Sequence, residues 1–283
     1  MCLIVLALHQ HPRYPLVIAA NRDEFLDRPT AALDWWQPAP HAAAIVAGRD
    51  LQAGGTWLGL NARGRVAMLT NVRDLPRHRA TALSRGEIVP SWLAADAAAD
   101  VFWRDAAPHA YNPFNLLAGD CSRGRWWWAD DRMPAPQPLA PGLYGLSNAT
   151  LDTPWPKVLR LKEAAADVLT AANTTYELES LLFAALADRS SVHDDALPDT
   201  GVGLARERWL APAFIRTPDA RYGTRCSTLL VAERHAQGMT MCLIERQFTT
   251  EGLAIAQRRV RFDGWPAASN GLPAVTIEPL NAA

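Results

Sequence analysis

The sequence has few cysteines and no long hydrophobic run, and both absences limit what it can encode. Its four cysteines, Cys2, Cys121, Cys226 and Cys242, show neither the C-x-x-C spacing nor a zinc-ligand pattern. We therefore expect reduced thiols in an intracellular, cytoplasmic protein. The opening apolar run, Cys2–Leu8, is short and has no basic residue before it. It predicts neither a secretory signal nor a transmembrane segment.

A strong excess of charge is also lacking. The formal net charge is −1, which argues against nucleic acid or an anionic membrane as the partner. The sequence has no G-x-S-x-G, P-loop, G-x-G-x-x-G or H-E-x-x-H motif, and its seven histidines are scattered. We therefore predict no metal site and no required cofactor. Only Lys157 and Lys162 are lysines among the 28 basic residues.

Tryptophan, in contrast, is abundant. The chain has 11 tryptophans, three of them consecutive at 126–128. We expect most of them to pack in the core and at contacts between elements. The alternative is an aromatic-lined pocket for a flat or apolar ligand.

Predicted strands and helices alternate in blocks along the chain. Strand patterns cover Cys2–Leu8, 16–20, 56–60, Arg65–Asn71, 115–119, 125–129, 143–148, 226–232, 239–246 and 253–262. Helical patterns cover 84–107, where Ser84 and Glu87 resemble a capping box, a stretch from 153–154 onward, 177–187 and a short segment at 206–210. This order predicts a single α+β domain, 1–283, with two stacked antiparallel sheets between helix pairs. Such an arrangement is a four-layer αββα sandwich.

Cys2 is the first candidate for chemistry. If Met1 is removed, one residue carries both a thiol nucleophile and an α-amine that titrates near neutral pH and can accept the proton. The alternative is that Cys2 is a small apolar residue at the start of a buried strand.

Four polar residues, Asn21, Arg22, Asp23 and Glu24, follow the second predicted strand. If the first two strands form a hairpin, these residues lie beside Cys2. Asp23 could then hold the amine, and Arg22 could neutralise the thiolate or bind an anionic ligand. The alternative is a solvated loop with an Arg–Asp pair.

A basic cluster follows the predicted strand that ends at Asn71. It contains Arg73, Arg77, His78, Arg79 and Arg85. These side chains could hold phosphate or carboxylate groups, or they could form a solvated basic loop.

The motif at 20–24, after Met1 and Cys2, resembles the signature of the NRDE family, also called the transport-and-Golgi-organisation family. Further blocks similar to that family occur in order at 54–59, 69–71, 114–116, 144–148, 153–155 and 222–225. Together they span nearly the whole chain.

The resemblance implies a fold and a site like those of the cysteine N-terminal-nucleophile (Ntn) hydrolases, the group of bile-salt hydrolase and penicillin V acylase. By that resemblance, Cys2 is nucleophile and base, and Asp23 orients its amine. Asn71 and Asn148 stabilise an oxyanion, and Arg225 favours the thiolate.

The resemblance also implies a ligand, because the family is associated with haem trafficking and with acyl-coenzyme A or lipid handling. We expect a binding or trafficking protein for a hydrophobic ligand with anionic groups, with haem as a possible cargo. The ligand-binding candidates are Asn21, Arg22, Glu24, Trp57, Arg73, Arg77, Arg79 and Tyr222. The alternative is a hydrolase that cleaves a linear amide or thioester through an acyl-enzyme on Cys2. The sequence does not predict the oligomeric state.

Overall fold

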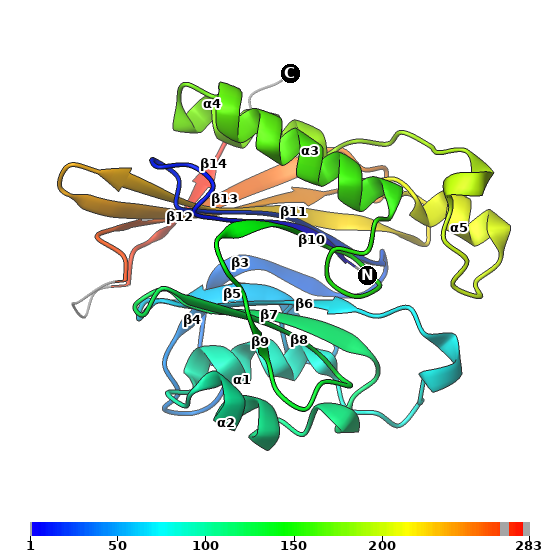
Figure 1. Ribbon diagram of the computed structural model, residues 1–283, viewed down its shortest axis with the longest axis horizontal. Helices are drawn as coiled ribbons and strands as arrows, with labels where there is room; N and C mark the ends of the chain where they lie inside the picture. The colour runs from blue at the N-terminus through cyan, green and yellow to red at the C-terminus, as the bar shows by residue number, and fades with distance from the viewer. Residues whose placement is uncertain (1, 267–271, 280–283) are drawn as a thin grey trace.

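The computed structural model describes residues 2–266 and 272–279. Met1, whose removal the nucleophile hypothesis requires, lies outside them. Two antiparallel sheets of seven strands each are stacked face to face. Helices α3 (Pro156–Ala171) and α4 (Thr175–Leu186) cover one sheet, and α1 (Ile88–Ala94) and α2 (Ala99–Asp105) cover the other (Figure 1). The predicted αββα sandwich is thus confirmed.

The first sheet combines strands from early in the chain with strands from late in the chain. Its order is β10 (Gly142–Leu146), β1 (Cys2–Leu8), β2 (Leu16–Phe25), β11 (Tyr222–His235), β12 (Gly238–Phe248), β13 (Ala254–Asp263) and β14 (Val275–Glu278). All of its pairs are antiparallel. The strand β2 therefore lies between β1, its hairpin partner, and β11, about 200 residues later in the chain.

The second sheet keeps the order of the chain. It consists of β3 (Thr30–Trp36), β4 (Ile45–Asp50), β5 (Leu58–Asn61), β6 (Arg65–Asn71), β7 (Phe114–Asp120), β8 (Arg125–Asp130) and β9 (Gln137–Pro138). A short helix, α5 (Leu204–Leu210), lies in the connection from α4 to β11.

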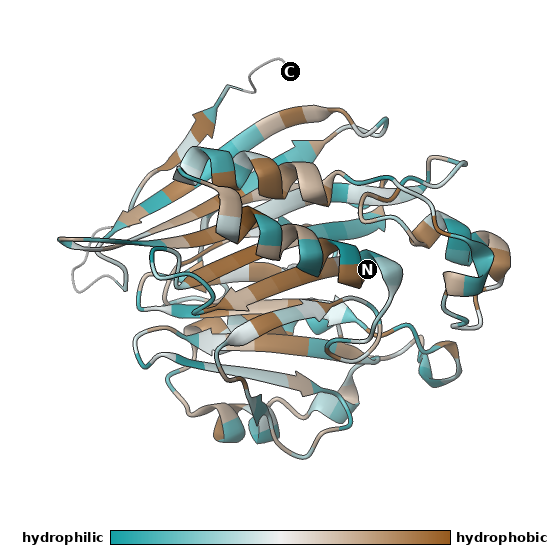
Figure 2. Ribbon diagram, turned by 45° about the horizontal axis from the view of Figure 1, so that its top comes forward, coloured by the Kyte–Doolittle hydropathy of each residue, from teal (hydrophilic) through white to brown (hydrophobic). Residues whose placement is uncertain are grey.

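Alternation along the strands divides the apolar side chains among three cores. Leu6 and Ile18 face the other sheet, whereas Val5 and Ala19 pack against α3 and α4. A third core lies between the second sheet and α1 and α2. Figure 2 accordingly shows largely hydrophobic strands in the middle of the molecule and hydrophilic loops at their ends. Each large apolar side chain that is fully buried contributes about 1.5–3 kcal/mol.

The tryptophans pack mainly in these cores, as we expected. Trp92 and Trp103 are 1% exposed and fill the core beneath the second sheet. Trp126 and Trp265 are buried between the two sheets. Trp209 is an exception, with 39% of its surface exposed.

Several element boundaries differ from the prediction. The strand β2 continues to Phe25, so residues 21–24 belong to the sheet and do not form a solvated loop. The helical region from 84 divides into a 3-10 turn, α1 and α2, and the Ser84 side chain makes no capping hydrogen bond. The helix α3 begins at Pro156, because the residue before a proline, Trp155, is held in an extended conformation. The strands β3, β4, β9 and β14 were not predicted.

A buried carboxyl group links the two sheets. Glu245 of β12 is 2% exposed, and its Oε1 accepts a hydrogen bond of 2.9 Å from the backbone N–H of Leu33 in β3. Burial raises its pKa to about 6, while hydrogen bonds from Leu33 and Cys226 and the charge of Arg22 oppose the shift. In the folded chain this group therefore keeps its proton to a higher pH than in the unfolded chain.

We predict that Glu245→Gln removes a pH-dependent loss of stability. The folded pKa lies above the unfolded value, so the free energy of unfolding falls as the pH rises from about 4.5 to 6, by about 2 kcal/mol. Glutamine keeps the acceptor but cannot ionise. Urea unfolding at pH 4 and pH 7.5 gives the difference in unfolding free energy between the variant and the wild type. We expect this difference to shift by about 2 kcal/mol in favour of the variant from pH 4 to pH 7.5. Exposed Glu163→Gln is the control, and an equal difference at both pH values for Glu245→Gln would contradict the prediction.

Candidate functional site

The β1–β2 hairpin places Cys2 at the register position of Arg22. This confirms that the polar residues of the second strand lie beside the start of the first. On the other side of β2, Gly223 pairs with Glu24 and Thr224 with Asp23. The two sequence blocks at 21–24 and 222–225 are therefore neighbours in one sheet.

A pocket of about 450 Å³ opens at this end of the stacked sheets. Among its lining residues are Arg22, Asp23, Glu24, Trp57 and Asn71, which were all predicted as site residues. Segments around 50–53, 56–57 and 80–86 complete the wall. The first sheet thus supplies one side of the pocket, and the second sheet with its loops supplies the other.

Arg22 is the buried cation of this pocket. It is 5% exposed, and its guanidinium carbon lies 4.2 Å from the centre of the Trp57 ring. Its Nη1 donates to Thr30 Oγ1 at 3.1 Å, and its Nη2 lies 3.9 Å from Asp50 Oδ2 and 4.0 Å from Glu24 Oε2. Two carboxylates and an aromatic face thus compensate its burial.

Arg28, which no motif indicated, is a second cation in the wall. Its Nε donates to Asp50 Oδ2 at 2.8 Å and lies 3.9 Å from Glu24 Oε2. Within the described part of the chain, its Nη1 and Nη2 make no hydrogen bond. Its side chain is 25% exposed, so these two nitrogens can reach a ligand.

Asp23 is the buried carboxyl group of the site, with an exposure of 1%. Thr224 donates from Oγ1 to Asp23 Oδ1 at 2.7 Å, and the Tyr222 hydroxyl donates to the Asp23 carbonyl at 2.9 Å. Burial raises the pKa of Asp23, and the charge of Lys157 and the Thr224 hydrogen bond oppose that rise. Tyr222 therefore contacts the backbone of the motif.

Asn21 has a structural role and bonds segments on the side of β2 that packs against the helices. Its Nδ2 donates to the carbonyls of Leu186 and Ala213, both at 2.8 Å, and its Oδ1 accepts from Ser227 Oγ at 2.6 Å. It is 1% exposed and is not a lining residue of the pocket. Its hydrogen bonds fix β2 to the segments that follow α4.

The two asparagines predicted as oxyanion donors lie next to each other, but only Asn71 lines the pocket. Asn148 is 1% exposed, and its Nδ2 donates to the Asn71 carbonyl at 2.8 Å. The Asn148 carbonyl in turn accepts from the backbone of Arg73 at 2.8 Å. In this arrangement Asn148 holds the end of β6 in place.

Three arginines of the predicted basic cluster, Arg73, Arg77 and Arg79, do not line the pocket. Arg73 Nη1 forms an ion pair of 2.6 Å with Glu207. Arg79 Nη2 donates to the carbonyls of His109 and Tyr111. Only Arg85 of this cluster lines the pocket, with its Nη1 bonded to the Pro113 carbonyl at 2.9 Å.

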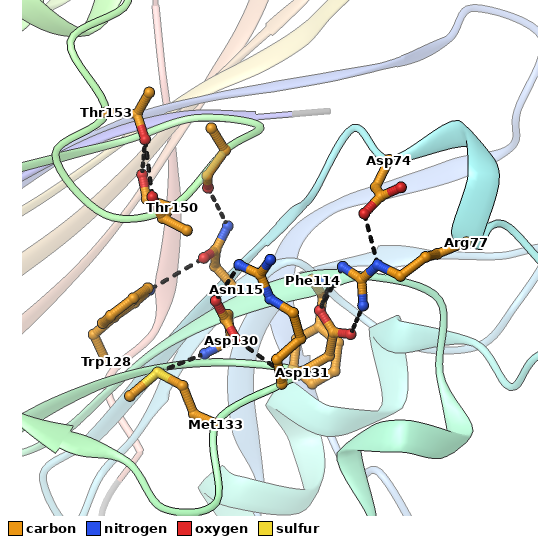
Figure 3. Close-up of polar contacts among 12 residues, drawn as sticks. Asp74, Arg77, Phe114, Asn115, Trp128, Asp130, Asp131, Met133, Thr150 and Thr153 are labelled. Carbon is orange, nitrogen blue, oxygen red and sulfur yellow. Dashed lines mark hydrogen bonds and ion pairs between the residues drawn. The ribbon is translucent and has the colours of Figure 1, made fainter. Parts of the chain in front are cut away.

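The third of these arginines, Arg77, lies between two carboxylates (Figure 3). It is 2.6 Å from Asp74 and 2.5 Å from Asp131, and these contacts raise its pKa. The cluster is thus neither one anion site nor a freely solvated loop.

Arg225 lies at a β-bulge between Thr224 and Cys226. Its Nη1 donates to the Leu26 carbonyl. Burial lowers the pKa of Arg225, and the neighbouring charge of Arg22 lowers it further. It is therefore close to the pocket cations, although it is not itself a lining residue.

The comparisons with known proteins identify the family. The sequence model of the family described as Transport and Golgi organisation 2 matches residues 1–250. The chain belongs to this family. The "Transport and Golgi organization 2 homolog" of Mus musculus is 32% identical over 251 residues, which are 82% of this chain and 89% of that protein. The homolog of Bos taurus is 35% identical over 254 residues, with the same shares of the two chains, 82% and 89%.

Two solved structures are also similar to this chain. The Caenorhabditis elegans N-acylethanolamine-hydrolyzing acid amidase ortholog has 12% identity and a TM-score of 0.42, covering 81% of this chain and 92% of its own. A mutant conjugated bile acid hydrolase from Clostridium perfringens has 8% identity and a TM-score of 0.46, and the match covers 99% of this chain and 97% of that chain.

The match to the Transport and Golgi organisation 2 family includes every residue that lines the pocket, whereas β13 and β14 lie beyond it. In the described residues, no group of three or more His, Cys, Asp or Glu side chains is placed to hold a metal ion. No helix in residues 2–266 and 272–279 has the length and apolar character needed to cross a membrane.

Four site residues were missed by the sequence analysis. Arg28 and Asp50 lie in the pocket wall, and Thr224 donates a hydrogen bond to Asp23. The charge of Lys157 opposes the rise in the pKa of Asp23. For Thr224 a signal existed, because it belongs to the block at 222–225. The other three belong to no motif that we used for site residues.

Proposed function

We propose that this member of the Transport and Golgi organisation 2 family binds a small molecule in the pocket through the anionic groups of that molecule. The observation that carries the proposal is Arg28, which lines the pocket and whose two terminal nitrogens make no hydrogen bond within the described residues. A guanidinium group presents paired N–H donors that match carboxylate and phosphate oxygens.

The wall around Arg28 supports a ligand with charged groups. Arg22 and Arg85 add positive charge to it, and the carboxyl groups of Asp23, Glu24 and Asp50 lie in the same wall. An anion that approaches Arg28 displaces water rather than an existing side-chain partner. Binding therefore does not require an ion pair to break.

The apolar part of the wall is small, with Trp57, Leu69 and Leu83 as its largest members. The body of a hydrophobic ligand, of the haem or acyl-coenzyme A type, therefore extends from the pocket while its anionic end enters. The described lining side chains include no histidine or methionine that could ligate haem iron. If haem is the cargo, its propionates are the groups held.

We place this binding or trafficking function in the cytoplasm. The free thiols of Cys121 and Cys242 in the described part of the chain support a reducing compartment.

We predict that Arg28→Gln weakens binding of the anionic ligand. Titrations with haemin and with palmitoyl-coenzyme A, followed by tryptophan fluorescence, should saturate with the wild type. The variant should lose about tenfold in affinity for the ligand that binds, because one charge-assisted contact is removed.

Arg63→Gln is the matched control, because Arg63 pairs with Asp96 on the surface and does not line the pocket. Equal affinities for Arg28→Gln, Arg63→Gln and the wild type would contradict the proposed role of Arg28.

The second candidate function is hydrolysis of a linear amide or thioester. The observation that favours it is the register of Cys2 with Arg22, which brings the start of the chain beside the buried Asp23. In this proposal the Cys2 thiolate attacks the carbonyl carbon, and its amine accepts the thiol proton and passes it to the leaving amine or thiol. Water then hydrolyses the thioester between acyl group and Cys2.

The remaining roles in this proposal are those that the resemblance implies. Asp23 orients the amine of Cys2, and Asn71, which lines the pocket, stabilises the oxyanion. Asn148 supports Asn71, and Arg225 adds positive charge near Arg22. Removal of Met1 is a condition of this mechanism.

We predict that Cys2→Ala separates the two functions. If the protein hydrolyses its ligand, the variant should lose turnover by at least about 10³-fold and retain binding. Cys121→Ala is the control, since that thiol lies outside the pocket wall. Intact-mass measurement of the wild type should show Met1 removed; active protein that retains Met1 would contradict the terminal-amine mechanism.

A further inference from the structure

Gly48 lies inside a strand, where its own backbone gives no reason for a glycine. It is the fourth residue of β4 and is buried. Its φ is not positive, in contrast to those of Gly54 and Gly64, which are 78° and 102°. Glycine in the interior of a strand weakens the strand and often marks the close approach of another group. The reason for a glycine at position 48 therefore lies in what packs against it.

The group that packs against Gly48 is the ring of Trp57. A methyl group at position 48 would place its carbon 2.5 Å from both Cζ2 and Cη2 of Trp57, and 2.8 Å from Glu245 Oε2. Carbon atoms in contact are ordinarily about 3.5–4.0 Å apart. The backbone of Trp57 is held by Leu69, whose N–H donates to the Trp57 carbonyl at 2.8 Å. A side chain at position 48 would therefore displace the ring.

The strand β4 carries this contact to the pocket. Val46 belongs to the core between the sheets, and Gly48 and Asp50 follow it at alternate positions, so they lie on the same face of β4. Asp50 lines the pocket and accepts a hydrogen bond from Arg28. The edge of the Trp57 ring thus takes the place of a side chain in a row that ends at the pocket.

Trp57 is also the contact that orients Arg22. The guanidinium carbon lies over the ring, 4.2 Å from its centre. The carboxylates of Asp50 and Glu24 lie 3.9 Å and 4.0 Å from Nη2, so they compensate the charge but are too far away to form hydrogen bonds. In the described residues, the Arg22 side chain makes one hydrogen bond, from Nη1 to Thr30 Oγ1. The ring face and this bond therefore set the plane of the guanidinium group.

We propose that Gly48 is a positioning residue of the pocket: the space left by its missing side chain admits the edge of Trp57, and Trp57 in turn holds Arg22 in the pocket wall. Trp57 then acts on a ligand through Arg22. The inference rests on the proposed function only in that it takes Arg22 as part of the binding wall.

The experiment measures the side-chain protons of Arg22 by NMR in protein labelled with ¹³C-arginine, with the signals assigned through Arg22→Lys. Protons above an aromatic ring are shifted upfield by its ring current. The wild type should therefore show Arg22 signals upfield of those of exposed arginines. In Gly48→Ala the ring has to move, and the upfield shift should be lost.

The double variant Gly48→Ala/Trp57→Phe tests the cause of that loss. A phenyl ring lacks the Cζ2 and Cη2 atoms that the methyl group would meet, so the Arg22 signals should regain at least part of the upfield shift. Gly119→Ala is the matched control, because a methyl carbon there would lie 2.7 Å from Cε2 and Cζ2 of Trp126, which does not line the pocket. The Arg22 signals should not change in this control.

Unchanged Arg22 signals in Gly48→Ala, or the same loss in Gly119→Ala, would overturn the inference. If Gly48→Ala does not fold, the double variant decides. A folded double variant with upfield Arg22 signals supports the inference. A double variant that fails to fold, or that folds without the upfield shift, overturns it.

Ligand titration separates this inference from the proposed function. Where haemin or palmitoyl-coenzyme A binds the wild type, Gly48→Ala should lose about tenfold in affinity and Gly119→Ala should not. An unchanged affinity in Gly48→Ala would overturn the role of Gly48 in the pocket. The NMR measurement itself uses no ligand, so a lost upfield shift in a protein that binds neither probe would leave the inference standing and refute the function. An unchanged shift in a protein that binds its ligand would do the reverse.

Discussion

The pairing of β2 with β1 on one side and β11 on the other is the constraint on which the site depends. It places the start of the chain, the 21–24 motif and the 222–225 block in one sheet, although they lie far apart in the sequence. Apolar residues of β1 and β2 are buried on both faces, so a shift of register by one residue would move charged groups into the cores. The geometry of the pocket is thus fixed by the packing of the sheet.

The same constraint explains why so many charges are buried near the pocket. Arg22 faces the space between the sheets, where Trp57, Asp50 and Glu24 compensate it. Asp23 lines the same pocket, where Thr224 bonds its Oδ1 and the charge of Lys157 opposes the rise of its pKa. Buried pairs of this kind contribute little net stability, and loss of one partner leaves the other uncompensated. Their presence at one end of the sandwich is therefore better explained by a functional site than by stability.

The sequence predicted the layers and the centre of the site because those features are local. Alternating apolar residues identified β1, β6 and β7, and the 21–24 motif identified Arg22 and Asp23 as neighbours of Cys2. The features it missed depend on tertiary packing.

Arg73 and Arg77, for example, looked like free cations in the sequence, but acidic partners up to 134 residues away along the chain bind them. Lys157 gave no signal either, because its burial depends on where α3 begins and where α5 packs.

The central claim is that this pocket holds the ligand of the protein. Its most direct test is a survey of small molecules bound to the protein as purified from cells, by mass spectrometry and visible absorbance. The survey compares the wild type with Ala82→Trp, in which a large side chain fills the pocket from its half-buried wall. We predict a molecule with anionic groups bound to the wild type and absent from the variant. The same molecule bound to both at equal stoichiometry would contradict the account.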